Sequence, residues 1–468
     1  MARLMRVRLA LLAVTVALLV TGCGGVAVAP PPVDDGRSIE PVVQFPELDV
    51  AVDQDRLGEH LEALMAIAEA NGGVRTVGTP GYEASVDYVA DRLDELGWRV
   101  ETPEEPFANF RELPGSVLEV HGRTFAAPDE LHALIYSAGG DVTAPIANME
   151  DSGCDAEHFQ GFPDGAIAVT SVGGCLRRQQ VMNADAAGAV AILMVYPERG
   201  AGEILRPTLL SPSGIEIPAA SVTREAGAAL QAADGDEAHL VIRTEREPGT
   251  LRNVIAELGD GERVVMLGGH LDSVIDGPGI NDNGSGVATL LEIARAAAEL
   301  GVPEGATLRL GFWGGEEFGI IGSSAYVDGL SDAERAAIHA YLNLDMVGST
   351  NGATFIYADD HAPRGSGGVT IDYEVWFEGR GLPTERLDLG GGSDHRAFAE
   401  AGIPTGGIFS GATDIKTDEQ ALRFGGTAGA ATDACYHLPC DDVDNVDLER
   451  AAVVGDASLA VALRLAAR

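Results

Sequence analysis

The chain has 468 residues, 46% of them hydrophobic, with 60 glycines and no long low-complexity tract. This length exceeds one typical domain, so we expect a globular protein of two domains plus a leader. Acidic residues outnumber basic ones by 72 to 31, which gives a formal charge of −41, and Lys416 is the single lysine. That balance opposes binding to nucleic acid or to an anionic membrane surface and favours an acidic, solvated exterior.

The first 22 residues have the pattern of an export signal. Arginines at positions 3, 6 and 8 precede an apolar stretch from 9 to 20 that is too short to span a bilayer comfortably, and small residues then lead to Cys23. The segment resembles a bacterial lipoprotein signal, which implies that Cys23 becomes the lipidated N-terminus of the mature protein. An ordinary secretory signal with a chance cysteine is the alternative.

Residues 23–48 include a run of three prolines at 30–32 and are expected to form a flexible tether. We therefore expect an exported lipoprotein of the bacterial cell envelope, held to a membrane by its N-terminal lipid. Its folded part would then face an oxidising compartment outside the cytoplasm.

Residues 49–113 are assigned to the first part of the main domain. They are expected to begin with two amphipathic helices separated by a turn, Gly-Thr-Pro-Gly, at 78–81. The second helix, 82–96, ends at Gly97, and a strand follows at 98–101. The first helix is marked by apolar residues at helical spacing, namely Leu57, Leu61, Leu64, Met65 and Ala68.

Residues 114–249 are rich in short strands and glycine or proline breaks, which predicts a small β-rich insert. A strand at 166–172, a helix at 179–187 and a strand at 189–196 stand out. The stretch 161–196, with GFPDGAIAV and GGC, resembles the protease-associated domain carried by many exopeptidases. Insertion before the main sheet is physically reasonable because domain insertions succeed at surface turns.

Four cysteines remain once Cys23 is set aside, an even number that agrees with export. They form two close pairs that are far apart in the chain, so we expect disulfides between Cys154 and Cys175 and between Cys435 and Cys440. A structural zinc site is the weaker interpretation, because neither pair has a second pair at zinc-finger spacing.

Residues 250–468 are assigned to the second part of the main domain. Apolar strands at 253–258, 264–269, 307–312 and 341–345 alternate with helical segments. This alternation predicts an α/β fold with a mixed, mostly parallel central sheet and helices on both faces.

Candidate functional residues begin at the end of the second of these strands. His270 is expected at the carboxyl end of a strand, where α/β sheets place their ligands. Asp272 lies on the same side and can accept the second ring N–H of a metal-binding histidine. Asp282 follows in a glycine-rich loop directly before a helix. Taken singly, each motif has an ordinary structural explanation. His270 could be a structural histidine whose hydrogen bonds are made within the protein, and Asp282 could be a helix cap.

Further carboxylates follow the next two strands. Glu316 and Glu317 come after the strand 307–312, and because adjacent side chains point differently, one can bind metal while its neighbour reaches a water molecule. Asp345 ends the strand LNLD, and His437 lies between two cysteines in CYHLPC. Together the motifs supply two histidines and three carboxylates, which is about the set that two bridged zinc ions need.

The ordered motifs H-x-D, N-D-N-x-S-G, E-E, N-L-D and C-Y-H resemble peptidase family M28, zinc aminopeptidases typified by the leucine aminopeptidases of Streptomyces and Aeromonas. The resemblance covers most of residues 253–447 and implies the zinc exopeptidase fold. It also implies two zinc ions that share Asp282 as a bridging ligand. Each ion would have two further ligands, His270 and Asp345 for one, and Glu317 and His437 for the other.

The resemblance further implies the roles of three neighbouring residues. Glu316 would be the general base that activates a metal-bridging hydroxide, and Tyr436 would stabilise the tetrahedral intermediate. Asp272 would accept the second ring N–H of His270. The substrate's free α-amino group would bind near the metals, so the expected activity is removal of N-terminal residues from peptides.

One stretch departs from the family pattern. Where the Streptomyces enzymes carry an arginine just before Ser-Asp, this chain has Gly392, and Arg396 lies close enough in sequence to substitute. Asp394 and His395 are interpreted as hydrogen-bonded residues lining the cleft, because the metal set is already complete.

Three alternative functions remain open from the sequence. A glutaminyl cyclase-like acyltransferase would keep a single zinc ion on a related fold. A carboxypeptidase or dipeptidase of the neighbouring zinc exopeptidase families would differ in the peptide end that it recognises. An inactive envelope binding protein would usually have lost ligands or the base, whereas Glu316 and all five ligand positions are present here.

Other ions are also conceivable partners. Cobalt or manganese would fit the same ligands as zinc. The acidic residues Asp441, Asp442 and Asp444 could bind calcium, but we interpret them as solvated loop charges.

Overall fold

The computed structural model describes Phe45 and residues 51–196, 204–358 and 361–468. The predicted signal, Cys23 and all of the predicted tether except Phe45 lie outside these residues. The described residues all belong to one compact unit. None of the helices in the described ranges has the length and apolar character needed to cross a membrane.

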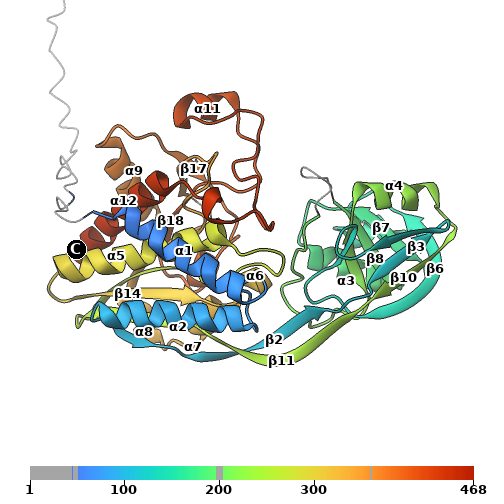
Figure 1. Cartoon of the computed structure of the whole chain (residues 1–468), viewed down its shortest axis with the longest axis horizontal. Coiled ribbons are helices and arrows are strands. Elements are labelled where there is room, and N and C mark those ends of the chain that lie inside the picture. The colour runs from blue at the N-terminus through green and yellow to red at the C-terminus, as the bar shows by residue number, and fades with distance from the viewer. Residues whose placement is uncertain (1–44, 46–50, 197–203, 359–360) are drawn as a thin grey trace, which may run out of the picture. The chain divides into compact units, whose positions relative to one another are not determined.

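An eight-stranded mixed sheet forms the centre of the main domain (Figure 1). Its strand order is β1–β12–β14–β13–β15–β18–β16–β17. The central pairs are parallel and the pairs β1/β12, β12/β14 and β16/β18 are antiparallel, so the predicted mixed, mostly parallel sheet is confirmed. The strands in this order are Arg99–Glu101, Val254–Gly259, Ala306–Trp313, Arg263–His270, Ile338–Leu344, Thr405–Phe409, Phe355–Tyr357 and Glu385–Leu387.

Side-chain alternation in the central strands gives this sheet a hydrophobic core on each face. In β13, Val265 and Leu267 belong to the larger core, while Val264 and Met266 belong to a second core on the opposite face. Helices cover both faces, as predicted. The larger core is covered by α1 (Gln54–Ala70), α5 (Gly286–Leu300), α9 (Ser366–Glu378) and α12 (Leu448–Ala466), and the second by α7 (Ile321–Gly329), α8 (Asp332–Ala337) and α10 (His395–Glu400).

Helix α2, Pro80–Glu95, begins earlier than the sequence predicts. The side chain of Thr79 accepts a hydrogen bond from the backbone N–H of Tyr82, and proline suits the first helical position because it has no N–H to leave unpaired. The predicted turn at 78–81 is therefore wrong in its second half, which is helical. The predicted stop is confirmed, since Gly97 has a φ of 80° and ends the helix.

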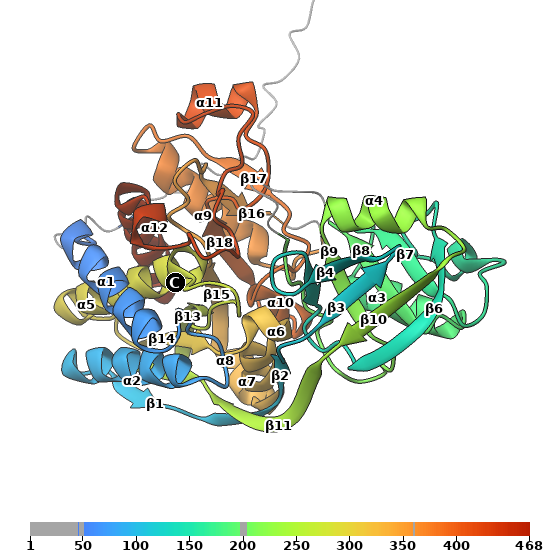
Figure 2. The same cartoon turned by 45° about the vertical axis from the view of Figure 1, so that its right-hand side comes forward.

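The insert is built on a second eight-stranded sheet, in the order β4–β3–β10–β6–β7–β8–β9–β5. Helix α3 (Arg177–Ala186) packs on β8, and α4 (Arg224–Ala232) packs on β8 and β6 (Figure 2). The predicted strand, helix and strand correspond to β7, α3 and β8. The strands in sheet order are Arg123–Ala126, Val117–Val120, Glu237–Ile242, Gly140–Asn148, Ile167–Ser171, Ala191–Val195, Ala219–Val222 and Leu131–Ala133.

A two-stranded antiparallel ribbon joins the insert to the main domain (Figures 1 and 2). It consists of β2, Glu104–Glu112, and β11, Thr244–Arg252. The two strands pair along their whole length, from Glu104 opposite Arg252 to Glu112 opposite Thr244. The chain therefore reaches the insert and returns from it along neighbouring paths.

Both predicted disulfides form. Cys154 is bonded to Cys175 in the insert, and Cys435 is bonded to Cys440 in a loop that precedes α12. Their Cα atoms are 5.7 Å and 5.3 Å apart, within the ordinary range for disulfides.

Candidate metal centre

The predicted ligands meet at one edge of the main sheet. His270 is the last residue of β13, and Asp345 directly follows β15. Glu317 lies in the short helix α6, Glu316–Gly319, soon after β14. Because β13 is parallel to both β14 and β15, the carboxyl ends of all three strands lie at the same edge. Asp282 enters from the turn η2, Ile280–Ser285, before α5.

The five side chains form two overlapping groups that share Asp282. One oxygen of Asp282 lies 3.1 Å from Nε2 of His270, and its other oxygen lies 3.1 Å from Nε2 of His437. Asp345 Oδ1 completes the first group at 3.4 Å from His270 Nε2. Glu317 Oε2 completes the second at 3.1 Å from His437 Nε2. A carboxylate with one oxygen in each group is placed as a bridging ligand would be.

The burial of these carboxylates fits a cation site. Asp282, Glu317 and Asp345 are each less than a tenth exposed. Within the described part of the chain, Glu317 Oε1 and Asp345 Oδ1 have no hydrogen-bond partner. Buried charge is stable when it is paired or coordinates a metal. Nitrogen and carboxylate ligands of this kind are those that zinc prefers.

The electrostatics of the centre agree with this interpretation. Burial opposes the charged form of His270, yet the neighbouring carboxylates, Asp345 foremost, raise its pKa well above the ordinary value. The pKa of His437 is raised in the same way by Glu317 and Asp282. Burial, together with the charge of Asp282, raises the pKa of Glu317 to about 7. Zinc needs neutral imidazoles and ionised carboxylates, so its binding would release protons from these groups.

Asp272 lies beside His270, but its contact differs from the expected one. Nδ1 of His270 is 3.0 Å from the backbone carbonyl oxygen of Asp272 and 3.7 Å from the nearer carboxylate oxygen. The carboxylate instead accepts hydrogen bonds from the backbone N–H groups of Gly315 and Glu316. The main chain therefore orients the imidazole, while the carboxylate holds the turn that carries both glutamates.

Glu316 lies where a general base would be needed. Its carboxylate is within reach of His270 and Glu317, and it lines a cavity of about 210 Å³ together with Asp282 and Asp345. Burial, together with the neighbouring carboxylates, raises the pKa of Glu316 well above its ordinary value. A carboxyl group with a raised pKa can both accept and return a proton near neutral pH.

Tyr436 lines the same cavity, and its ring stacks on that of His437 with centroids 3.8 Å apart. Burial and the nearby carboxylates raise the pKa of Tyr436 well above the ordinary value, so the phenol keeps its proton. His437 has a φ of 61°, an unfavourable backbone conformation for a residue with a side chain. The Cys435–Cys440 disulfide brackets both residues and constrains this loop.

Asp441 contradicts our interpretation of the acidic run as solvated charges. It is 1% exposed and accepts hydrogen bonds from the backbone N–H groups of Asn281 and Asp282. The side chain of Asn445 also donates to it. Asp441 is buried because it satisfies the backbone of the turn that presents Asp282, which leaves it poorly suited to calcium. Asp444 is exposed, as expected.

Sequence reasoning missed Arg75, which is completely buried. Its guanidinium donates to the backbone carbonyls of Leu271, Pro278 and Gly279. These residues lie between His270 and Asp282, so one side chain fixes the connection between two predicted ligands. Nothing in the local sequence, a glycine-rich turn, distinguishes this arginine from a surface residue.

The remaining sequence candidates lie beside the metal groups rather than in them. Asp394 accepts a hydrogen bond from Ser323, and the ring of His395 packs edge-on against Tyr357. Neither belongs to any of the potential ligand groups found in the described residues. Gly392 and Arg396 line a larger cavity of about 520 Å³ that also contains Glu316 and Tyr436.

Comparisons with known proteins agree with this geometry. Residues 253–462 match the model of peptidase family M28, and residues 142–230 match that of the PA domain. The chain is 38% identical to an aminopeptidase of Pseudomonas aeruginosa over 421 residues, which are 85% of this chain and 78% of the relative. It is 38% identical to a probable lipoprotein aminopeptidase of Mycobacterium tuberculosis over 460 residues, 93% of this chain and 89% of the relative.

A solved structure extends the agreement to the whole fold. The zinc aminopeptidase of Bacillus subtilis matches with a TM-score of 0.69 and 26% sequence identity, over 88% of this chain and 94% of that one. The main domain and the inserted domain therefore both have counterparts among known proteins. The chain belongs to peptidase family M28.

Proposed function

We propose that this protein is a zinc-dependent aminopeptidase that hydrolyses the N-terminal peptide bond of peptides, with two zinc ions and Glu316 as general base. The observation that carries the proposal is the pair of ligand groups that share Asp282, with Glu316 beside them. The similarity to an aminopeptidase of Pseudomonas aeruginosa and to a probable lipoprotein aminopeptidase of Mycobacterium tuberculosis supports the reaction class.

Five residues would hold the metals. His270 and Asp345 would bind one zinc ion, Glu317 and His437 the other, and Asp282 would bridge them. When bound, the ions supply a Lewis acid for the scissile carbonyl and a lowered pKa for the attacking water. Each zinc ion carries two positive charges, so the two ions would offset the negative charge of the three buried carboxylate ligands.

The chain's own groups would then move the protons. Glu316 would accept a proton from the attacking water and return it to the leaving amine. Tyr436 keeps its proton and donates a hydrogen bond to the oxyanion of the tetrahedral intermediate. Asp272 holds the Gly315–Glu316 turn through two backbone N–H groups, so the base stays aimed at the reacting centre.

Two kinds of observation support a location outside the cytoplasm. Two disulfides indicate export to an oxidising compartment. The name of the mycobacterial relative and the Cys23 motif support a lipid anchor, which we include in the proposal. Replacement of Cys23 by alanine should then release the protein from the membrane fraction.

The decisive experiment measures hydrolysis of aminoacyl anilides by the purified mature protein, with chelator and with added zinc. We expect release that chelator abolishes and zinc restores. In Glu316→Gln, kcat should fall by about 10²- to 10⁴-fold with zinc still bound. Elemental analysis should give two zinc ions per chain.

Other outcomes would point elsewhere. Cleavage only of N-blocked peptides would indicate a carboxypeptidase. Cyclisation of N-terminal glutamine with one bound ion would indicate an acyltransferase. Bound zinc without turnover of any substrate would favour a binding protein.

A further inference from the structure

The larger cleft beside the metal centre has one wall from each part of the molecule. Its volume is about 520 Å³, within the range of about 300 to 1,000 Å³ typical of small-molecule sites. Glu316 and Glu317 line one side, and the insert contributes Val172, Leu176 and Arg177. A space of this size accommodates a short peptide rather than a folded protein.

Direct contacts hold the insert against the helix that carries the glutamates. The hydroxyl of Thr208 donates a hydrogen bond of 2.9 Å to the backbone carbonyl of Phe318 in α6. The ring of Phe318 also meets two other rings edge-on, that of Tyr136 in the insert and that of Phe107 in the ribbon strand β2. These contacts place the insert wall directly beside the helix that carries Glu316 and Glu317.

Three arginines line this cleft, and they differ in how their charge is balanced. Arg206 forms ion pairs with Glu112 and Asp276. Arg396 forms one with Glu400.

Arg177 has no carboxylate within ion-pair distance in the described part of the chain. Its Nε and Nη1 donate to the hydroxyl of Tyr196 and the backbone carbonyl of Cys175. A cation without an acidic partner stands out in a chain with 72 acidic residues. Arg177 is also among the residues that line the cleft.

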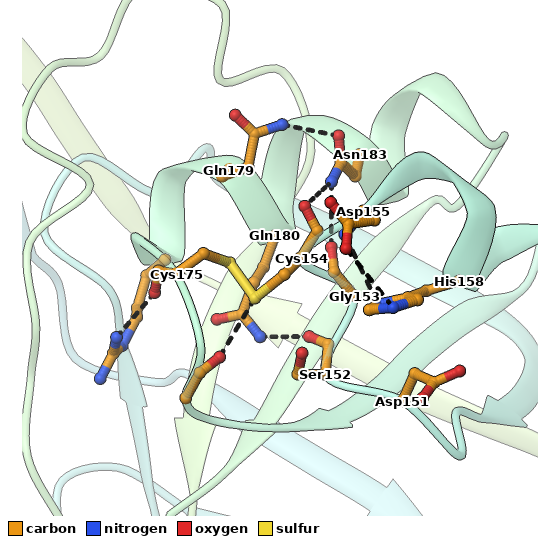
Figure 3. Close-up of a disulfide and its surroundings, with 12 residues drawn as sticks. Asp151, Ser152, Gly153, Cys154, Asp155, His158, Cys175, Gln179, Gln180 and Asn183 are labelled. Carbon is orange, nitrogen blue, oxygen red and sulfur yellow. Dashed lines mark hydrogen bonds and ion pairs between the residues drawn. A yellow bond between two sulfur atoms is a disulfide. The ribbon is translucent and has the colours of Figure 1, made fainter.

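The Cys154–Cys175 disulfide joins the chain two residues before Arg177 to the loop that carries Cys154 (Figure 3). Gln180 donates to the backbone carbonyls of Ser152 and Ser171, and Asn183 donates to those of Gly153 and Cys154. These contacts tie the start of α3 to the loop that carries Cys154. The backbone that carries Arg177 is thus held in place, and the guanidinium itself is held by Tyr196 and Cys175. Such preorganisation lowers the entropy cost of binding.

We propose that Arg177 is a specificity-determining residue that binds a carboxylate of the peptide substrate, downstream of the scissile bond. The proposal rests on the proposed function, in which the substrate's N-terminus faces the metal centre. The rest of the peptide then extends across the cleft to the insert wall. A guanidinium is the side chain best suited to bind a carboxylate there. Leu176, 56% exposed beside it, offers an apolar surface to the adjoining substrate residue.

The test compares Arg177→Gln with the unmodified enzyme on di-, tri- and tetrapeptides, each as free acid and as C-terminal amide. A further set of amides carries glutamate at the last position, which separates an acidic side chain from a terminal carboxylate. Arg224→Gln is the matched control, because Arg224 is exposed on the insert and does not line the cleft. Binding of the same peptides is also measured by calorimetry in the Glu316→Gln background.

We expect Arg177→Gln to raise KM for the best free-acid peptide by about tenfold or more, since it removes a charge-assisted hydrogen bond. Its kcat, its KM for the amides without a carboxylate and its anilide hydrolysis should stay unchanged. Arg177→Lys should recover part of the loss. Calorimetry should show the same selective weakening. An equal effect on acids and amides, or no effect, would overturn the proposal. Absence of anilide hydrolysis by the unmodified enzyme would instead reject the proposed function.

Discussion

The two walls of the cleft are made of different chemistry. The main domain contributes histidine, aspartate and glutamate from strand ends and adjoining turns. Among the described residues, those that the insert contributes to the larger cavity are apolar, hydroxyl-bearing or arginine, without a histidine or a carboxylate. Each wall also has its own disulfide next to the cleft. The difference suggests that one part carries out the reaction and the other selects what reaches it.

Asp282→Asn should have the largest effect, because it removes the carboxylate that both ligand groups share. We expect the affinity for zinc to fall by more than about 100-fold at both positions, with activity lost in parallel, since even supporting residues contribute 10- to 100-fold. Elemental analysis after dialysis measures this. Asp414 is an exposed carboxylate that lines the smaller cavity, of about 210 Å³, but belongs to none of the ligand groups. The control variant Asp414→Asn should therefore keep both zinc ions. Retention of both ions by Asp282→Asn would contradict the shared ligand.

Opening the Cys435–Cys440 disulfide should affect the reactive wall. In the double variant Cys435→Ser, Cys440→Ser, the loop that holds His437 in its unfavourable backbone conformation is released. We expect zinc affinity to fall by about tenfold and activity to recover at high zinc concentration. A competition titration against a chelating dye measures the change. Unaltered affinity would show that packing alone positions His437.

Opening the Cys154–Cys175 disulfide should affect only the preference for substrates with a free carboxylate. In Cys154→Ser, Cys175→Ser, we expect both zinc ions and anilide hydrolysis to be retained, while KM for the best free-acid peptide rises by about three- to tenfold because Arg177 is less fixed. Steady-state kinetics on acids and amides reveal this. Loss of zinc from this variant would break the division between the two walls.

The smallest expected effect is a change in the stability of the folded state on replacing the buried carboxyl group of Asp394. Burial, together with Asp345 and Asp272, raises the pKa of Asp394 to about 7 from an ordinary value of 3.8. The folded state therefore holds this proton more tightly, so the contribution to stability is complete below pH 3.8 and is lost as the pH rises through 7. In metal-free protein, Asp394→Asn should raise Tm by a few degrees at pH 8 and by much less at pH 4. A Tm gain that is equal at both values would contradict the assigned cause.

Much of this arrangement could be predicted because its signals are local. His270, Asp345 and the two glutamates each follow an apolar strand, and parallel strands bring such positions to one edge. Periodicity likewise predicted the helices, and spacing predicted both disulfides. Periodicity cannot show a helix start that depends on a single capping residue, so the sequence predicts a turn at Pro80 where the structure has the first residue of α2.

The supporting contacts could not be predicted, because their partners are distant in sequence. Arg75 meets carbonyls about 200 positions away, and Asp441 meets backbone N–H groups 159 and 160 positions away. Arginine in a polar turn and aspartate in an acidic run have the appearance of surface residues until the fold buries them. The sequence predicts the carboxylate of Asp272 beside His270. Its hydrogen bond from the backbone N–H of Gly315, however, depends on how two separate loops pack.

The ribbon of β2 and β11 has a consequence for the history of such enzymes. Since Glu112 and Thr244 are paired neighbours, a short turn between them would close the two strands into an ordinary hairpin. The chain order and strand connections of the main sheet would remain as they are. The insert can therefore be gained, lost or exchanged as a cassette at the level of the gene, and substrate preference can evolve without disturbing the residues that cut the peptide bond.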